Sequence, residues 1–154
     1  MPEYSVTTEA LYQGNHIRGM EMHPETIPCF LTTAFTMKGF KEVQETYDTK
    51  GYTYIRTRNP NRTALGEVIS CLEGGEESLI FSSGMGAITT TLMAVLEPGD
   101  HVICNANIYG ETFCVMTQIL KKCNVDVTFV DYQNTEDIAK AVQPNTKLIY
   151  SEVF

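Results

Sequence analysis

Residues 78–104 read SLIFSSGMGAITTTLMAVLEPGDHVIC. The apolar run 78–81 predicts a short buried strand, and residues 87–96 predict a helix that Pro98-Gly99-Asp100 ends. Residues 101–104 are again apolar and predict a second strand. A strand, a short loop, a helix and a strand in this order form a βαβ unit, which predicts a parallel sheet.

The same alternation continues on both sides of this segment. Asn59-Pro60 predicts a helix start, because an N-cap side chain precedes a proline, and Gly74-Gly75 predicts the end of that helix. Its expected apolar face comprises Leu65, Val68, Ile69 and Leu72. Further helices are expected at 112–122 and 135–142, and further strands at 125–130 and 147–153. We therefore expect an α/β fold, with a mostly parallel sheet that helices cover on both faces.

The chain before residue 59 has a different character. It holds Pro2, Pro24 and Pro28 and few long periodic runs, so we expect residues 1–58 to form an arm of short elements with little core. Residues 59–154 are then expected to form the first part of a larger domain. A parallel sheet that stopped after residue 153 with no covering helix would leave an exposed apolar edge.

Composition excludes several classes of partner and site. The 154 residues carry 11 Lys+Arg and 19 Asp+Glu, a net charge of −8, which disfavours nucleic acid or an anionic membrane as the main partner. No apolar run approaches the ~20 residues of a membrane span, and no signal peptide is readable, so we expect a cytoplasmic protein. The cysteines and histidines lack metal-ligand spacing, and Cys71, Cys104 and Cys114 are expected to be structural.

Residues 82–86, Ser-Ser-Gly-Met-Gly, join the first predicted strand to its helix. Glycines admit an anion close to the backbone, and serine hydroxyls and a helix N-terminus add donors, so the loop is a candidate cradle for one phosphate. It lacks the Gly-Lys-Ser/Thr of a Walker A loop, and Thr89 replaces the third glycine of GxGxxG. A tight turn that uses glycine only for its geometry is an equally good interpretation.

Two further features favour a ligand with a phosphate and a planar ring. Tyr109 stands after the predicted strand 101–104, where it can reach the same rim and stack on a ring. If residues 52–58 are extended, Tyr52, Tyr54, Arg56 and Arg58 share one side, and arginine suits phosphate. The competing interpretation is that Tyr109 is an aromatic residue of a surface loop and that residues 52–58 form a solvated strand, neither of which binds a ligand. A dinucleotide would need an acidic ligand for its ribose at the end of the second strand, where the sequence offers Asn105-Ala-Asn107 and no carboxylate before Glu111. The combination therefore favours pyridoxal 5'-phosphate (PLP) over a dinucleotide.

Residues 52–112, from YTYIRTRNPNR through SSGMG to NIYGET, resemble the Cys/Met-metabolism PLP enzymes. These are methionine and cystathionine γ-lyases, cystathionine β-lyases and O-acetylhomoserine sulfhydrylases, and the resemblance extends over about residues 26–154. It implies an aminotransferase-like fold type I large domain in a homotetramer built as a dimer of dimers. It also implies C–S bond elimination or γ-replacement on a sulfur-containing amino acid, through a Schiff base with PLP.

The resemblance implies a role for particular residues. Tyr54 and Arg56 of the YxR motif would hold the PLP phosphate of the neighbouring subunit. Ser83, Gly84 and Met85 would form the phosphate loop, with Gly84 and Met85 binding through their backbone N–H groups.

Tyr109 would be both a cofactor-binding and a catalytic residue, because it would stack on the pyridine ring and assist proton transfer or departure of the leaving group. Glu152 would begin a motif that normally continues with Ser/Ala-Asn-Pro. Glu111 stands where methionine γ-lyases typically carry a cysteine, which weighs against methionine as the substrate.

The seven lysines do not lie in the sequence context of the family's Schiff-base lysine. We therefore expect an amino-terminal fragment that is inactive by itself. A transferase of the O-acetylhomoserine sulfhydrylase type is an alternative. A non-catalytic truncated homologue that pairs with intact subunits, or a phosphate- or nucleotide-binding domain unrelated to PLP, are alternatives of other classes.

Overall fold

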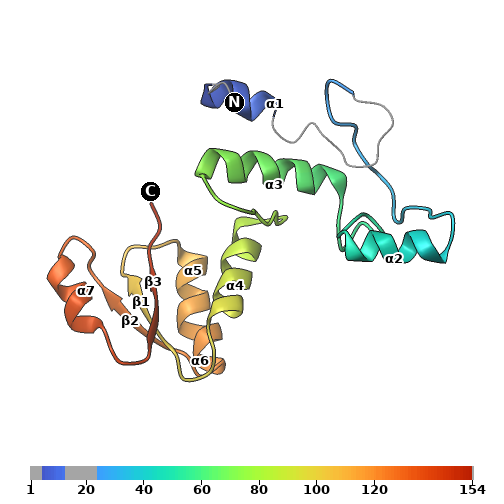
Figure 1. Ribbon diagram of the computed structural model, residues 1–154. Coiled ribbons are helices and arrows are strands. Elements are labelled where there is room, and N and C mark those ends of the chain that lie inside the picture. Colours follow the sequence, from blue (N-terminus) through green and yellow to red (C-terminus); the bar gives the residue numbers. More distant parts are fainter. Residues whose placement is uncertain (1–4, 13–23, 154) are drawn as a thin grey trace. The chain divides into compact units, whose positions relative to one another are not determined.

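Three parallel strands form the centre of the carboxyl-terminal half of the chain (Figure 1). They are β1 (His101–Asn105), β2 (Asp126–Val130) and β3 (Thr146–Tyr150), in the spatial order β2-β1-β3. Each begins within one residue of its predicted start, and the predicted α/β fold with a parallel sheet is confirmed. The strand predicted for 147–153 ends earlier, at Tyr150.

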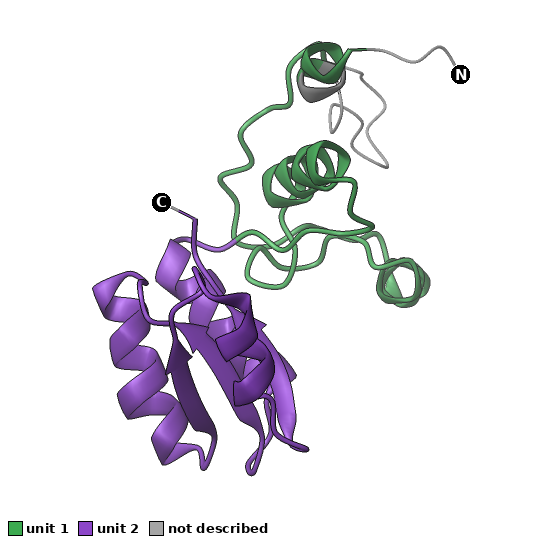
Figure 2. Ribbon diagram, turned by 90° about the vertical axis from the view of Figure 1, so that its left-hand side faces the viewer, with its two compact units in different colours: residues 1–80 green, residues 81–154 purple. Residues whose placement is uncertain are grey.

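The computed structural model describes residues 5–12 and 24–153. The chain divides into two compact units, 1–80 and 81–154, which Figure 2 distinguishes by colour and which we describe separately. The helix that starts after Asn59 groups with unit 1. The expected arm 1–58, which would serve a neighbouring subunit, stays a prediction.

Helices lie on both sides of the sheet in unit 2, with α4 and α5 on one side and α7 on the other (Figure 1). The chain crosses from β1 to β2 and then back past β1 to β3, and crossovers of the usual right hand in opposite directions place their helices on opposite sides of the sheet. The helices are α4 (Gly84–Val95), α5 (Gly110–Cys114), α6 (Leu120–Lys122) and α7 (Thr135–Ala141). A π-helical segment, η1 (Val115–Ile119), makes α5 and α6 one continuous helix, and the sequence did not predict it.

The core of unit 2 forms where α4 and the α5–α6 helix pack on β1. Its buried members are Leu92, Val102, Cys104, Met116, Leu120 and Val125. Strand β1 is fully buried over His101–Cys104 because it is the central strand of the sheet. The structural role expected for Cys104 fits its place here, whereas Cys114 is exposed.

His101 is buried at the amino-terminal end of β1. Its Nδ1 is hydrogen-bonded to Thr146 Oγ1 and its Nε2 to Thr128 Oγ1, each at 2.8 Å. Thr128 belongs to β2 and Thr146 to β3, so one imidazole links all three strands.

The strand predicted for residues 78–81 is absent. This segment has no regular secondary structure, and Leu79 and Phe81 are 77% and 37% exposed. A strand needs a neighbour for its backbone hydrogen bonds, and none of the described segments lies beside this one as a partner strand. The segment has the apolar composition of a strand, but in the part of the chain that the structure describes it lacks the neighbouring strand that would complete its backbone hydrogen bonds.

Unit 1 contains three helices among its described residues: α1 (Val6–Tyr12), α2 (Phe40–Asp48) and α3 (Pro60–Glu73). The start and end predicted for α3 are confirmed, because Asn59 is its N-cap and Gly74 closes it with φ 65°. The predicted apolar face is not buried: Leu65, Ile69 and Leu72 are exposed, and the buried positions are Pro60, Ala64, Gly66 and Ser70. Within the described ranges, no helix of either unit has the length and hydropathy of a membrane span.

Candidate functional site at the carboxyl edge of the sheet

The predicted phosphate loop forms the start of α4. Ser83 is the N-cap, and its hydroxyl accepts a hydrogen bond from the N–H of Gly86 at 3.0 Å. A Cβ at position 86 would lie 3.0 Å from Ser83 Oγ, so a larger residue there would press on the capping hydroxyl. With Ser83 as its N-cap, α4 begins at Gly84, three residues before the start predicted for the helix 87–96.

The first turn of α4 leaves donors free. No acceptor among the described residues is bonded to the backbone N–H of Gly84 or Met85. A Cβ at Gly84 would meet nothing within 4 Å, so the space in front of the loop is open. Free N–H groups at the positive end of a twelve-residue helix favour an anion.

A hydrogen-bonded network joins this loop to Tyr109 and Glu152. Glu152 Oε2 accepts from the backbone N–H of Tyr109, and Glu152 Oε1 accepts from the Thr112 and Tyr150 hydroxyls, each at 2.7 Å. The Thr112 hydroxyl also lies 3.8 Å from Met85 Sδ. Unit 2 thus brings the loop, the Tyr109 backbone and Glu152 to the carboxyl edge of the sheet, and the Tyr109 side chain is 53% exposed there.

This network shifts the ionisation of its members. Burial raises the pKa of Glu152, but the hydrogen bonds from Tyr109, Thr112 and Tyr150 outweigh it, and the net pKa lies below its ordinary value. Burial raises the pKa of the Cys104 thiol to about 12, with a smaller contribution from the Glu152 charge. Burial and Glu152 together also raise the pKa of Tyr150. At neutral pH, Glu152 is therefore charged, while the Cys104 thiol and the Tyr150 hydroxyl are neutral.

Tyr54 and Arg56 lie in unit 1, on a turn. The extended conformation considered for residues 52–58 is wrong, because the Tyr54 carbonyl accepts from the N–H groups of both Thr57 and Arg58. The backbone of Tyr54 pairs with Ala34 in an isolated antiparallel bridge. The guanidinium of Arg56 lies 4.8 Å from the centre of the Tyr54 ring and has no carboxylate partner among the described residues.

Residues at the start of α3 hold the turn that follows Tyr54 in place. The Arg62 guanidinium donates to the carbonyls of Ile55 and Arg56, at 2.9 and 3.1 Å. The Asn59 side chain accepts from the N–H groups of Asn61 and Arg62. Sequence reasoning missed the role of Arg62, and the only signal for it was the NPNR run that closely follows the YxR motif.

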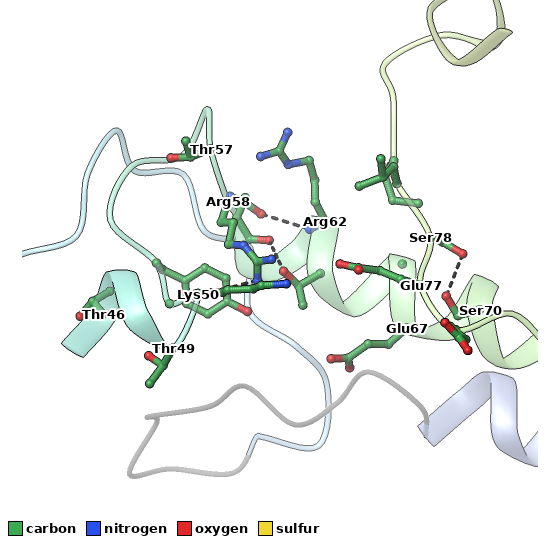
Figure 3. A pocket seen from close by; sticks show the side chains of 18 of the residues that line it. Thr46, Thr49, Lys50, Thr57, Arg58, Arg62, Glu67, Ser70, Glu77 and Ser78 are labelled. Carbon is green, nitrogen blue, oxygen red and sulfur yellow. Dashed lines mark hydrogen bonds between the residues drawn. The ribbon is translucent and has the colours of Figure 1, made fainter. Parts of the chain in front are cut away.

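A pocket of about 1100 Å³ lies in unit 1 (Figure 3). Its lining includes Arg58 and Arg62, together with Glu67 and Glu77, but neither Tyr54 nor Arg56. The Arg58 guanidinium donates to the Lys50 carbonyl at 2.9 Å, and Arg62 is bound to the turn. The charges in this pocket are mixed and its arginines are used locally, so it offers no distinct phosphate site.

The lysines of unit 2 lie away from the network. Lys121, Lys122 and Lys140 are in the last turns of their helices, and Lys147 is near the start of β3. In a parallel βαβ unit, helix ends and strand starts lie at the amino edge of the sheet, opposite Tyr109. Within the described residues no three His, Cys, Asp or Glu side chains form a metal-binding group, and His16 and His23 lie outside these residues.

Comparison with known proteins gives a consistent set of relatives. The model of a family described as Cys/Met metabolism PLP-dependent enzymes matches residues 7–154. Cystathionine gamma-lyase of Bacillus subtilis is 48% identical over 102 residues, which are 66% of this chain and 27% of that protein. L-methionine gamma-lyase of Treponema denticola is 36% identical over 127 residues, 81% of this chain and 32% of that protein.

A solved structure of a similar protein has the same fold. The crystal structure of MetB from Corynebacterium glutamicum superposes with a TM-score of 0.84 at 29% identity, covering 95% of this chain and 36% of that one. The chain therefore spans about a third of the length of the proteins that it resembles.

Proposed function

The chain belongs to the Cys/Met metabolism PLP-dependent enzymes, and on this basis we propose that it supplies the amino-terminal part of an enzyme that eliminates or replaces carbon–sulfur bonds in amino acids. The observation that carries the proposal is the free first turn of α4, which the Met85–Thr112–Glu152 contacts join to Tyr109. An anion donor set and an exposed aromatic ring at one sheet edge suit a phosphorylated planar cofactor.

The residues present fit PLP. The N–H groups of Gly84 and Met85 and the Ser83 hydroxyl would bind its phosphate, and the Tyr109 ring would stack on its pyridine. When bound, PLP withdraws electron density from the amino acid's α-carbon and so permits loss of the proton and departure of the sulfur substituent. The Tyr109 hydroxyl would transfer a proton at this step, since its side chain is exposed at the rim.

Tyr54 and Arg56 would contact the phosphate of a neighbouring subunit in a homo-oligomer. The support is that the Arg56 charge is unpaired in the described residues, whereas Arg58 and Arg62 are occupied with backbone carbonyls. An unpaired arginine that packs on an aromatic ring is a suitable partner for phosphate.

The lysine for the Schiff base is expected from outside unit 2. The four lysines of that unit lie near the amino edge of the sheet, whereas Tyr109 lies at the carboxyl edge. Lys38, Lys41 and Lys50 of unit 1 do not lie in the sequence context of the family's Schiff-base lysine, so we propose that a segment of the enzyme outside residues 1–154 supplies it, as the partial coverage of the relatives allows.

The proposal is tested by borohydride reduction of the endogenous protein followed by intact mass measurement. We expect one pyridoxyl adduct on a species heavier than 17.2 kDa, and the protein before reduction should release a 2-oxo acid from a sulfur-containing amino acid. Arg56→Ala should weaken PLP retention on dialysis, whereas Arg58→Ala removes the same charge nearby and should retain it. Absence of an adduct, or equal retention in both variants, would contradict the assignment.

A further inference from the structure

The Glu152 carboxylate collects donors from three separate places in unit 2. They are the backbone N–H of Tyr109 before α5, the hydroxyl of Thr112 on α5, and the hydroxyl of Tyr150 at the end of β3. All three distances are 2.7 Å, the length of charge-assisted hydrogen bonds. Both carboxylate oxygens are used, so the orientation of the group is fixed.

The environment keeps this carboxylate charged. Thr112 is completely buried, and Cys104, which is also buried, lies close enough for the Glu152 charge to raise the pKa of its thiol. Burial opposes the charge on Glu152, and the three hydrogen bonds outweigh that cost, since its net pKa is lowered. The three donors therefore favour the charged form of Glu152 over its protonated form.

The hydrogen bond from the Tyr109 N–H to Glu152 takes the place of a capping interaction that residues near the start of α5 do not supply. Tyr109 is the N-cap residue of α5, and its own side chain makes no capping hydrogen bond. Glu111, two residues on, is not at the third helical position from which a capping-box carboxylate reaches back. Glu152, 43 residues further along the chain, supplies the acceptor and places negative charge at the start of the helix.

We propose that Glu152 is a positioning residue whose carboxylate fixes the backbone of Tyr109, and thereby the direction of the tyrosine ring at the carboxyl edge of the sheet. This inference rests on the proposed function in one respect only, namely that the ring faces PLP. The bond itself needs no cofactor, because it joins residues of this chain alone.

The test is hydrogen exchange at the Tyr109 amide of the full chain, measured by mass spectrometry without added PLP. Glu152→Gln keeps the size of the side chain but removes the charge and one acceptor oxygen, and we expect exchange to accelerate roughly ten- to a hundredfold. Tyr150→Phe removes a donor from the same carboxylate but leaves the Tyr109 bond, so its Tyr109 amide should exchange as in the unmodified chain.

Protection of the Val102 and Ile103 amides in β1 reports whether each variant is folded. If Glu152→Gln loses that protection, Glu152→Asp, which keeps the charge on a shorter side chain, takes its place with the same expectation. Equal Tyr109 exchange in the folded Glu152 variant and the unmodified chain overturns the proposal.

The holoenzyme gives a second readout. Glu152→Gln should lower kcat by a larger factor than PLP affinity, because it disturbs the Tyr109 ring but not the phosphate donors of α4. A loss confined to PLP retention would overturn the proposal. Failure of the proposed function would show instead as no pyridoxyl adduct on the unmodified protein, with the effect on Tyr109 exchange intact.

Discussion

The buried imidazole of His101 ties three strands together, and its removal should be costly. His101→Ala would leave a cavity and remove the imidazole partner of the Thr128 and Thr146 hydroxyls, so we expect a loss of about 2–4 kcal/mol in the free energy of unfolding. Urea denaturation monitored by circular dichroism measures it. Lys140→Ala breaks only exposed ion pairs on α7 and should cost less than about 1 kcal/mol. Comparable losses in the two variants would contradict the role given to His101.

Glu152 should make stability depend on pH in the acid range. Its pKa is lowered in the folded protein from an ordinary value of 4.5, so the folded state binds the proton less readily than the unfolded state. The contribution of Glu152 is therefore present above about pH 4.5 and is lost as pH falls through the lowered pKa. Urea midpoints between neutral and acid pH should fall less steeply in Glu152→Gln than in the unmodified chain. Parallel curves would contradict the assignment.

At the scale of elements, the two glycines of the α4 start should respond differently. Gly86→Ala brings a Cβ to 3.0 Å from Ser83 Oγ and weakens the cap, so it should leave unit 2 less stable than Gly84→Ala does, by about 1 kcal/mol. Gly84→Ala meets open space and should leave stability unchanged or raise it, since alanine is the better helix former.

The same pair separates folding from binding. If the phosphate lies against the first turn of α4, Gly84→Ala should weaken PLP binding without destabilising the protein. Equilibrium dialysis of PLP, together with thermal unfolding, measures both quantities. Unchanged PLP affinity in a stable Gly84→Ala variant would move the phosphate away from this loop.

Elements whose ends depend on local residues were predictable from the sequence. Asn59 and Gly74 bound α3 through contacts within a few residues, and β1 is apolar because it is central. The segment 78–81 was mispredicted because a strand also needs a neighbour, and composition does not reveal one. The turn at Tyr54 was mispredicted because the Arg62 side chain that holds it comes from the following helix.

The site shows the same division between local and distant contacts. The Ser83 cap and the free N–H groups behind it follow from five consecutive residues, so the loop could be identified from sequence. The bond between Tyr109 and Glu152 spans 43 residues and depends on β1 and β3 being neighbours. Strand order is a property of the folded sheet, and the role of Glu152 was therefore not visible in the sequence.

At the scale of the whole molecule, the proposed sharing of sites between subunits can be tested by mixing inactive variants. If Arg56 serves the neighbour's site and Tyr109 its own, a hybrid dimer of Arg56→Ala and Tyr109→Ala subunits has one site with both defects and one with none. Co-expression of the two variants of the whole enzyme should restore roughly a quarter of the unmodified activity, since half of the dimers are hybrids.

The matched control combines Gly84→Ala with Tyr109→Ala, two changes proposed for the same site, where every hybrid site keeps one defect. Release of 2-oxo acid measures both mixtures. Restoration in neither mixture would place Arg56 in its own subunit's site, because each hybrid site would then carry a single defect.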